Sequence, residues 1–469
     1  MNLKQIIFFF VLLGIFFIPF NSWGGLPFLG EFAKESSTIF FLIASGIFFF
    51  KITLKGRLVV PYRNPIFWSL LLVLIWFILS TVINLPNILD YKFKGLNGVM
   101  RFIRQYGALV MSAIIFLLTF YNAFHKKDNK RLFLNIRKVF FISFCFVSVY
   151  AFLEIAYIKL GISQFKPILN FFDYLPFVNV IIDTTNLRIS SLTHEPPAFS
   201  SFLLTTAGWM FSYILTGKGF KKYIPALLVL VFALFSDSRS ALVIIFTQAF
   251  IFLLFLAHKK NFQHILIRIG IVGLVAVMAI GVYKGQEISE YIVEKATSFG
   301  VNDGTHSISN KTRFGIQYAL GQVFLENPVS GVGFGQQAYE SRRHYPSWAV
   351  EDNWEFRLMY LNPDHPNFPP GYNLYLRLLA ETGIVGFLLF SSFLCLIIFT
   401  CIKLIRQKNE NQIIGMVILI SMVGLIINWV QIDTFRVFGF WINLALLLYV
   451  TRNKFTFLKL NKIKSKEEE

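Results

Sequence analysis

Residues 65–84 read PIFWSLLLVLIWFILSTVIN and contain no charged side chain. A helix of this length crosses about 30 Å of hydrocarbon, which is the thickness of a bilayer core. Similar apolar runs recur at residues 5–20, 37–50, 107–122, 139–160, 197–216, 223–236, 240–257, 265–283, 384–402, 412–429 and 435–450. The sequence therefore predicts an all-α, polytopic membrane protein with about twelve transmembrane helices.

The overall composition agrees with lipid as the solvent. Of the 469 residues, 55% are hydrophobic, 17% are aromatic and only 15% are charged, whereas soluble domains carry about 25% charged residues. A water-soluble fold of this length has too little interior to bury so much apolar surface. The composition excludes a soluble enzyme, a disordered chain and a fibrous protein.

The positive charge of the chain predicts its orientation in the membrane. There are 44 Lys and Arg against 25 Asp and Glu, a net charge of +19. Much of it lies in short segments between apolar runs, such as KITLKGR (51–57), HKKDNKR (125–131) and GKGFKK (217–222). Lys and Arg accumulate on the cytoplasmic side, so the excess indicates topology and not a nucleic-acid partner. We expect both termini in the cytoplasm and an uncleaved first helix.

The predicted connections differ greatly in length. Cytoplasmic connections are short, whereas residues 286–383 make a large outer loop between the ninth and tenth spans. Long connections are usually functional or disordered, and TRFGIQYALGQVFLEN (312–327) in this loop has helical periodicity, with Phe314 and Tyr318 on one face. The predicted organisation is nine spans in 1–285, a partly helical periplasmic loop in 286–383, three spans in 384–450 and a charged cytoplasmic tail in 451–469.

Four segments on the predicted outer side carry ionisable residues near membrane depth, where charge is costly and usually functional. They are RISSLTHEPP (188–197) with Arg188, His194 and Glu195; SDSRS (236–240) with Asp237 and Arg239; NKTRFGIQYA (310–319) with Lys311 and Arg313; and DHPNFPPGYNLYLR (364–377) with His365, Tyr372, Asn373 and Arg377. Guanidinium groups suit a diphosphate, and a carboxylate or imidazole can take a proton from a hydroxyl. The pattern predicts group transfer from a diphosphate donor.

Each segment also has a structural interpretation. Arg239 can pair with Asp237 or extend to the interface from a helix end. Glu195 can cap the helix that begins at two prolines, and Arg313 can be an ordinary solvated residue. Structural roles are equally compatible with the single histidines. The convergence of several arginines and candidate bases on one membrane face favours a functional site.

Other motifs are absent from the sequence or do not fit. There is no Walker A motif, which excludes that class of ATPase, and no HExxH, DxD or clustered carboxylates that would indicate a metal site. GVGFG (331–335) follows a helix instead of a strand, so it indicates a turn and not a dinucleotide site. We expect no metal and no cofactor.

The order of three motifs resembles a known family. SRSAL (238–242) follows a span, TRFGIQYA (312–319) precedes PVSGVGFG (328–335), and YNLYLRLLAETGIVG (372–386) leads back into the membrane. This order is similar to that in the bacterial O-antigen ligase and polymerase superfamily, the WaaL-type ligases and Wzy-type polymerases. The resemblance covers roughly residues 188 to 390.

The resemblance implies a metal-independent, inverting glycosyltransferase with a GT-C-like fold. It would take glycan from undecaprenyl diphosphate at the periplasmic face of the bacterial inner membrane. On the matching positions, Arg239 and Arg313 would hold the diphosphate, and we place Arg188 with them. Ligases of the family have a histidine where this chain has Tyr372, which leaves the base open among the catalytic candidates His194, Glu195, His365 and Tyr372.

Three functions remain to be compared. A polymerase that extends an acceptor glycan is favoured by the His-Glu-Pro stretch and by the missing histidine, and a chain-length regulator is then a candidate partner. A ligase would transfer the glycan to lipid A-core. A flippase or other transporter is disfavoured because the two halves of the chain differ and the charges gather at the outer face instead of the midplane.

Overall fold

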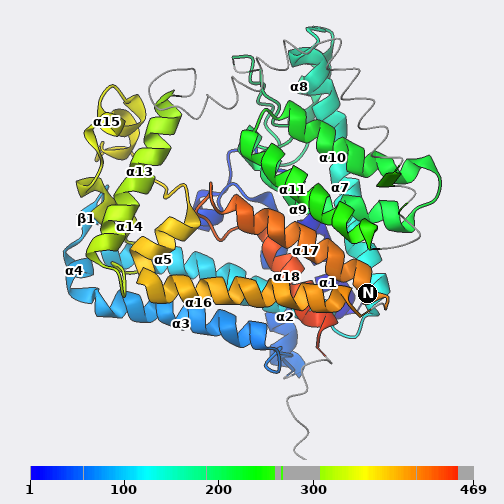
Figure 1. Ribbon diagram of the computed structural model, residues 1–469, viewed down its shortest axis with the longest axis horizontal. Helices are drawn as coiled ribbons and strands as arrows, with labels where there is room; N and C mark the ends of the chain where they lie inside the picture. The colour runs from blue at the N-terminus through cyan, green and yellow to red at the C-terminus, as the bar shows by residue number, and fades with distance from the viewer. Residues whose placement is uncertain are drawn as a thin grey trace, which may run out of the picture.

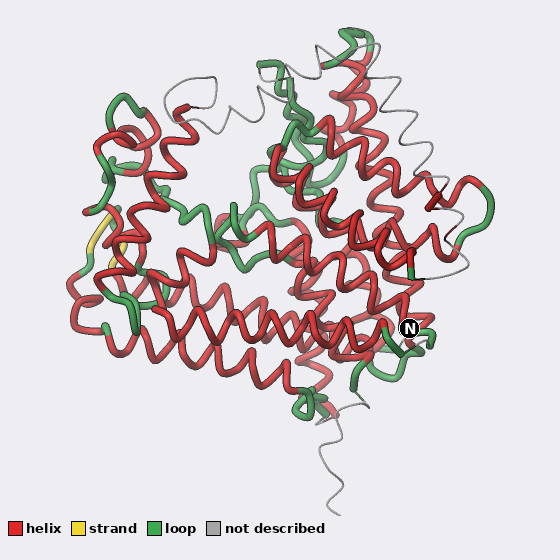
Figure 2. The backbone as a smooth tube through the Cα atoms, viewed as in Figure 1, coloured by secondary structure: helices red, strands yellow, loops and turns green. Residues whose placement is uncertain are grey.

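The computed structural model describes residues 2–55, 57–185, 187–258, 263, 266, 267, 307–407 and 409–452. This part of the chain is almost entirely helical (Figures 1 and 2). The α-helices are α1 (Leu3–Phe16), α2 (Ser36–Lys55), α3 (Pro65–Ile83), α4 (Leu85–Asp90), α5 (Gly98–Val110), α6 (Leu117–Phe124), α7 (Asn129–Ile158), α8 (Phe165–Phe171), α9 (Pro196–Thr216), α10 (Ile224–Phe235), α11 (Arg239–Ala257), α13 (Ser307–Glu326), α14 (Gln337–Glu340), α15 (Ser347–Val350), α16 (Leu374–Ile405), α17 (Asn411–Asn428) and α18 (Phe438–Val450).

Short irregular elements connect the α-helices. The 3-10 turns are η1 (Pro27–Phe32), η3 (Phe172–Tyr174), η4 (Phe220–Tyr223) and η6 (Ser341–Arg343), and the π-helical turns are η2 (Met111–Phe116) and η7 (Glu355–Tyr360). The strands β1 (Lys92–Phe93) and β2 (Leu96–Asn97) pair as an antiparallel hairpin. Because η2 joins α5 to α6 without a break, these three elements form one continuous helix.

Eight of the described helices are long and apolar enough to cross a membrane. They are α2 from Ser36 to Leu54, α3, the continuous helix Gly98–Phe124, α7, α9, α11, α16 and α17, and the shorter α1 and α18 are also apolar. The prediction of an all-α, polytopic membrane protein is therefore confirmed. The count of twelve stays a prediction, because most of the run at 265–283 lies outside the described residues and the run at 223–236 is the 12-residue helix α10.

The centre of the molecule is built from α9, α11, α17 and α18. Gln248 of α11 is fully buried, and its Nε2 donates to the carbonyls of Leu204 in α9 and Ile420 in α17, both at 2.9 Å. A Cβ on Gly424 would collide with this amide, and one on Gly208 would collide with α17. Small residues thus bring the helix backbones close together, as is usual in membranes. All of α18 is buried, which explains why a 13-residue helix can be apolar on every side.

The described part of the large outer loop forms a compact helical cluster at the end of the molecule where α16 begins (Figure 1). In α13 the buried face consists of Ile316, Leu320 and Val323, together with small residues. Phe314 and Tyr318, which share a face in the sequence pattern, lie away from this buried face and are 39% and 49% exposed. The small residues decide the packing: Gly315 lies so close to Ala349 of α15 that a Cβ would collide with it.

Helix α16 is kinked at Gly383, which has a φ of 65°. Its predicted start at residue 384 falls at this kink, ten residues after the helix begins at Leu374. A kink frees backbone groups, which must find other partners. The amides of Val332 and Gly333 donate to the carbonyls of Ala380 and Glu381 at 3.0 and 2.8 Å.

The neighbouring helix α3 supplies the remaining donors at the kink. Trp76 Nε1 donates to the Thr382 carbonyl at 2.9 Å, and Ser80 Oγ donates to those of Ser330 and Glu381 at 2.7 and 3.0 Å. Figure 1 shows α3 and α16 lying side by side. The segment PVSGVGFG therefore acts as a turn that fixes the kink of α16 and ties the outer loop to the membrane helices.

Candidate functional site

The segment that carries Arg188 is anchored to α7 by a buried carboxylate. Glu154 is fully buried, and its two oxygens accept hydrogen bonds from the amides of Ser190 at 3.1 Å and Ser191 at 2.8 Å. Ser191 Oγ also donates to the carbonyl of Val147 at 2.9 Å. An intramembrane carboxylate is costly unless its oxygens are bonded, so Glu154 holds this segment in one position at the end of α7.

His194 and Glu195 lie at the beginning of α9, where Glu195 occupies the N-cap position without a capping hydrogen bond. His194 Nε2 lies 3.5 Å from Glu195 Oε1, and His194 Nδ1 lies 3.2 Å from Asn21 Oδ1. Asn21 Oδ1 also accepts from the His194 amide at 3.1 Å, which identifies it as the oxygen of that side chain. Both ring nitrogens of His194 therefore face side-chain oxygens, those of Asn21 and Glu195.

The charges around Glu195 favour its ionised form. The hydrogen bond from His194 is the main cause, and together with the positive charges of His194, Arg313 and Arg188 it outweighs the effect of burial and lowers the pKa of Glu195. Glu195 is therefore a carboxylate at neutral pH. The alternative role of a helix cap is not seen at this N-terminus.

The structure brings together the three arginines that the sequence analysis assigned to a diphosphate. Arg239 begins α11, directly after the capping residue Ser238, and is close enough to Arg188 and Arg313 for their charges to repel. The Nε of Arg188 is buried and has no hydrogen-bond partner among the described residues. We call Arg188, Arg239 and Arg313 the arginine group; cations gathered in this way favour a bound anion.

Tyr372 contacts the arginine group through Arg313. The guanidinium carbon of Arg313 lies 5.3 Å from the centre of the Tyr372 ring, and the Tyr372 hydroxyl lies 2.8 Å from that of Tyr360. Burial is the main cause that raises the pKa of Tyr372, and the neighbouring Tyr360 and Glu355 raise it further. The phenol therefore stays protonated and does not serve as a base at neutral pH.

Backbone geometry around the site is unusual. Leu187, Asp237 and Tyr372 all have a positive φ, between 52° and 53°, although none of them is glycine. Each of these residues is a predicted site residue or lies within two positions of one. Such conformations cost of order 1–3 kcal/mol and persist where the surrounding structure enforces them, often at functional sites.

His365 is not part of this arrangement. Its Nδ1 accepts a hydrogen bond from the Asn367 amide at 3.2 Å, so the ring is engaged within its own loop. Lys94 in the β1–β2 turn donates to the carbonyls of His365 at 2.9 Å and Met359 at 2.6 Å. Among the described contacts of His365, none reaches the arginine group. The structure thus brings Arg188, His194, Glu195, Arg239, Arg313 and Tyr372 together and leaves His365 apart.

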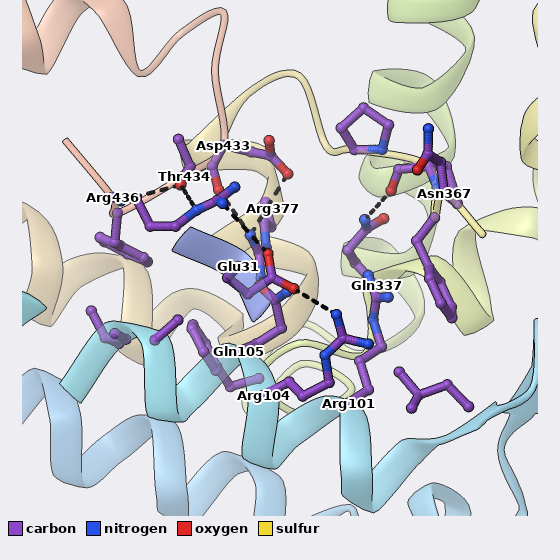
Figure 3. Close-up of a pocket in the computed structure, with 18 of the residues that line it drawn as sticks. Glu31, Arg101, Arg104, Gln105, Gln337, Asn367, Arg377, Asp433, Thr434 and Arg436 are labelled. Carbon is purple, nitrogen blue, oxygen red and sulfur yellow. Dashed lines mark hydrogen bonds and ion pairs between the residues drawn. The ribbon is translucent and has the colours of Figure 1, made fainter. Parts of the chain in front are cut away.

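The sequence analysis missed a polar pocket of about 430 Å³ next to this cluster (Figure 3). Its charged lining residues are Glu31, Arg101, Arg104, Arg377, Asp433 and Arg436. Arg377 Nε lies 3.1 Å from the fully buried Glu381, and Arg377 NH1 donates to the Asp433 carbonyl at 2.8 Å. The sequence does mark the lining residue Arg101, and Glu381, the partner of Arg377, because both are charged residues inside or beside apolar helices.

Metal ligands do not gather in this region. Within the described residues, no group of three or more His, Cys, Asp or Glu side chains lies close enough to hold a metal ion. The arginine group presents guanidinium groups that can bind an anion. The site can therefore bind an anion through arginines and accept a proton on Glu195.

Comparison with known proteins agrees with this chemistry. Residues 224–391 match the family model described as O-antigen ligase, and this range includes Arg239, Arg313 and Tyr372 but not Arg188 or Glu195. No curated protein matches the chain. This match covers less than half of the chain, and it supports the resemblance to the O-antigen ligase and polymerase superfamily of glycan-transferring membrane enzymes.

Proposed function

We propose that this protein is an O-antigen polymerase. It would transfer glycan repeat units from undecaprenyl diphosphate to a sugar hydroxyl of an acceptor glycan at the periplasmic face of the inner membrane. The observation that carries the proposal is the convergence of Arg188, Arg239 and Arg313 around the ionised Glu195. These residues come from three separate segments of the chain, and together they match the two needs of the reaction.

The first need is a stabilised leaving group. As the bond between the anomeric carbon and the diphosphate oxygen breaks, negative charge grows on the diphosphate. The arginine group offsets that charge, and fixed cations aimed at developing charge are among the strongest contributors to catalysis. The buried, unpartnered Nε of Arg188 is a donor already available for an oxygen of the diphosphate.

The second need is a proton acceptor. The acceptor hydroxyl attacks the anomeric carbon from the face opposite the diphosphate, a new carbon–oxygen bond forms, and the configuration is inverted. Its proton passes to the carboxylate of Glu195, which His194 keeps ionised through the contact at 3.5 Å. Tyr372 supports the site through Arg313 and does not take the proton.

A ligase that transfers glycan to lipid A-core is the second candidate, and it is equally compatible with the match to the O-antigen ligase family. The residues favour the polymerase, because a histidine expected in ligases is replaced by Tyr372 and the candidate base is in the His-Glu-Pro stretch (194–196). A lipid-linked sugar flippase is the third and weakest candidate, since it would need no base at all.

Deletion of the gene separates these candidates. Surface lipopolysaccharide from the deletion strain is analysed on a gel, together with the lipid-linked glycan of the inner membrane. A single repeat unit on the core supports the polymerase. Undecorated core with lipid-linked polymer accumulating supports the ligase, and lipid-linked single units retained on the inner leaflet support the flippase. Complementation with the Glu195→Gln variant then tests the mechanism, since it should fail while the protein still reaches the membrane.

A further inference from the structure

The pocket of about 430 Å³ has the size of a small-ligand site. Figure 3 shows it between α5, the first turn of α16, the proline-rich loop 366–370 and the loop 433–436. All four segments adjoin the ends of membrane helices on the side of the large outer loop. The pocket is separate from the arginine group, none of whose members lines it.

Arg101 is a buried cation that faces this pocket with spare donors. It is only 8% exposed, and its Nε donates to the Gly335 carbonyl at 2.6 Å. Its two terminal nitrogens have no acceptor among the described residues. The guanidinium carbon lies 3.8 Å from the centre of the Phe368 ring, which holds the group flat against an aromatic wall. A buried guanidinium left in this state is a site for an anionic group.

The remaining cations of the pocket are only partly compensated. Arg104 and Arg436 share one carboxylate, Glu31, at 3.4 and 3.7 Å. Glu35 acts on Arg436 from further away. Arg377, in contrast, is compensated by Glu381 at 3.1 Å and Asp433 at 3.6 Å. Positive charge therefore exceeds negative charge on the side of the pocket formed by α5.

The rest of the lining suits a sugar. Aromatic and proline rings form its apolar walls, namely Phe334, Tyr360, Phe368, Phe435, Pro366, Pro369 and Pro370. Such flat faces pack against the C–H faces of a pyranose ring. The side-chain amides of Gln105, Gln337 and Asn367 line the same space and can bond hydroxyl groups. Apolar walls with a few fixed polar groups are typical of specific ligand sites.

Two series of contacts connect the pocket to residues of the candidate site, one to Arg313 and one to His194. On one side its lining residue Tyr360 bonds Tyr372, which lies under Arg313. On the other side Arg436 acts on Glu35, whose carboxyl shares Asn21 with His194. The pocket is thus connected to the candidate site through its lining residues Tyr360 and Arg436.

We propose that this pocket binds the acceptor glycan through an acidic sugar, whose carboxylate is held by Arg101 and Arg104. This inference rests on the proposed transfer reaction and adds to it the chemical class of the acceptor. The carboxylate fills the place beside Arg101 that no protein acceptor occupies, while the sugar ring lies against Phe368. The donor diphosphate stays on the arginine group.

The test measures binding to the purified full-length protein in detergent. The probes are a trisaccharide that ends in glucuronic acid and the same trisaccharide with that carboxylate reduced to an alcohol. The acidic probe should bind at least tenfold more tightly, as expected for one or more charge-assisted hydrogen bonds. Equal affinities of the two probes, or no binding of the acidic one, would overturn the proposal.

Variants and a competitor locate the binding. Arg104→Gln should reduce the preference for the acidic probe to about threefold or less, and because Arg104 is half exposed, this change should not disturb folding. Arg101→Gln should act in the same direction, and the exposed Arg343→Gln should retain the full preference. Farnesyl diphosphate should not displace the acidic probe. Displacement, or a preference that survives both pocket variants, would assign the anion to another place.

The outcomes also separate this inference from the proposed function. Glu195→Gln should abolish transfer but leave binding of the acidic probe unchanged. If binding is selective while Glu195→Gln transfers glycan normally, the proposed mechanism fails and the acidic-sugar pocket stands. If transfer needs Glu195 but the probes bind equally, the pocket assignment fails and the transfer function stands.

Discussion

The guanidinium carbon of Arg313 lies 5.3 Å from the centre of the Tyr372 ring. The distance is typical of a cation–π contact, which contributes about 0.5–2 kcal/mol depending on how far water is excluded. Arg313 belongs to the large outer loop, whereas Tyr372 directly precedes the capping residue of α16. The contact therefore fixes an arginine of the loop against the membrane helices.

Replacement of Tyr372 tests whether its ring or its hydroxyl matters. Tyr372→Phe keeps the ring under Arg313 and loses only the bond to Tyr360, so transfer should stay within about fivefold of wild type. Tyr372→Ala removes the ring, and the loss of about 2 kcal/mol of positioning should lower kcat by roughly 30-fold. Initial rates with lipid-linked donor measure both. A Tyr372→Phe variant as inactive as Tyr372→Ala would show that the hydroxyl is essential.

The membrane class and most of the candidate site could be predicted from the sequence. Charged residues near membrane depth are costly and usually functional, so Arg188, Arg239 and Glu195 were visible as candidates. Each of these residues could be recognised from its own neighbourhood in the sequence, because each lies in a segment that leads into a predicted span. That these residues meet in space was an expectation that only the helix arrangement could test.

Features that depend on distant contacts could not be predicted in the same way. The kink of α16 is fixed by Trp76 and Ser80, which lie about three hundred residues before Thr382 and Glu381. The packed face of α13 does not follow from periodicity, because periodicity marks large apolar residues whereas close packing here uses Gly315. The residues that line the polar pocket come from five separate parts of the chain. The sequence of any one of these parts therefore does not predict the pocket.

The pH dependence of transfer should report the state of Glu195. The pKa of this carboxyl is lowered, mainly by His194, so the basic form persists as the pH falls below the usual range of a glutamate. The acid limb of kcat/KM should therefore lie at a lower pH than an unperturbed glutamate would give. His194→Gln removes the cause and should move this limb to higher pH. An unchanged limb in His194→Gln, with activity retained in Glu195→Gln, would remove Glu195 as the base and return His365 to consideration.

The orientation of the large outer loop can be tested by labelling. Ser347 and Lys218 are exposed and are predicted on opposite sides of the membrane. In a background without Cys145, Cys395 and Cys401, a membrane-impermeant thiol reagent should label Ser347→Cys but not Lys218→Cys in cells with a permeabilised outer membrane. After lysis both should react. The reverse pattern before lysis would invert the predicted topology.

The kink of α16 at Gly383 predicts that the addition of a single methyl group at this position lowers the stability of the protein. Gly383 has a φ of 65°, and a Cβ there would collide with the carbonyl of Val329. Gly383→Ala should therefore destabilise the protein by at least about 1–3 kcal/mol. Gly46 is the matched control, because its Cβ would meet no neighbour within 4 Å, and Gly46→Ala in the middle of α2 should be neutral or stabilising. Thermal unfolding in detergent compares them, and equal melting temperatures for Gly383→Ala and wild type would contradict the assigned role.

Arg239 and Arg313 should be the most sensitive positions for transfer. Alanine removes a charge-assisted bond to the diphosphate, each worth about 1.5–3 kcal/mol and more where water is excluded, so both alanine variants should lose at least tenfold to a hundredfold in kcat. Lysine keeps the charge but not the planar, two-pronged geometry, and should retain partial activity. Arg343, exposed and paired with Glu340 at 3.1 Å, is the control in which alanine should be tolerated.

The same residues predict how the reaction responds to chelators. In the proposed mechanism the arginine group neutralises the diphosphate, which is the role that a divalent cation plays in many other transferases. Purified protein with lipid-linked donor should therefore continue to turn over in excess EDTA, at a rate within about twofold of the untreated enzyme. Addition of Mg²⁺ or Mn²⁺ should not rescue the alanine variants. If EDTA stops wild-type turnover and either cation restores it, the arginines do not neutralise the diphosphate by themselves. A bound metal ion would then take part in stabilising the leaving group.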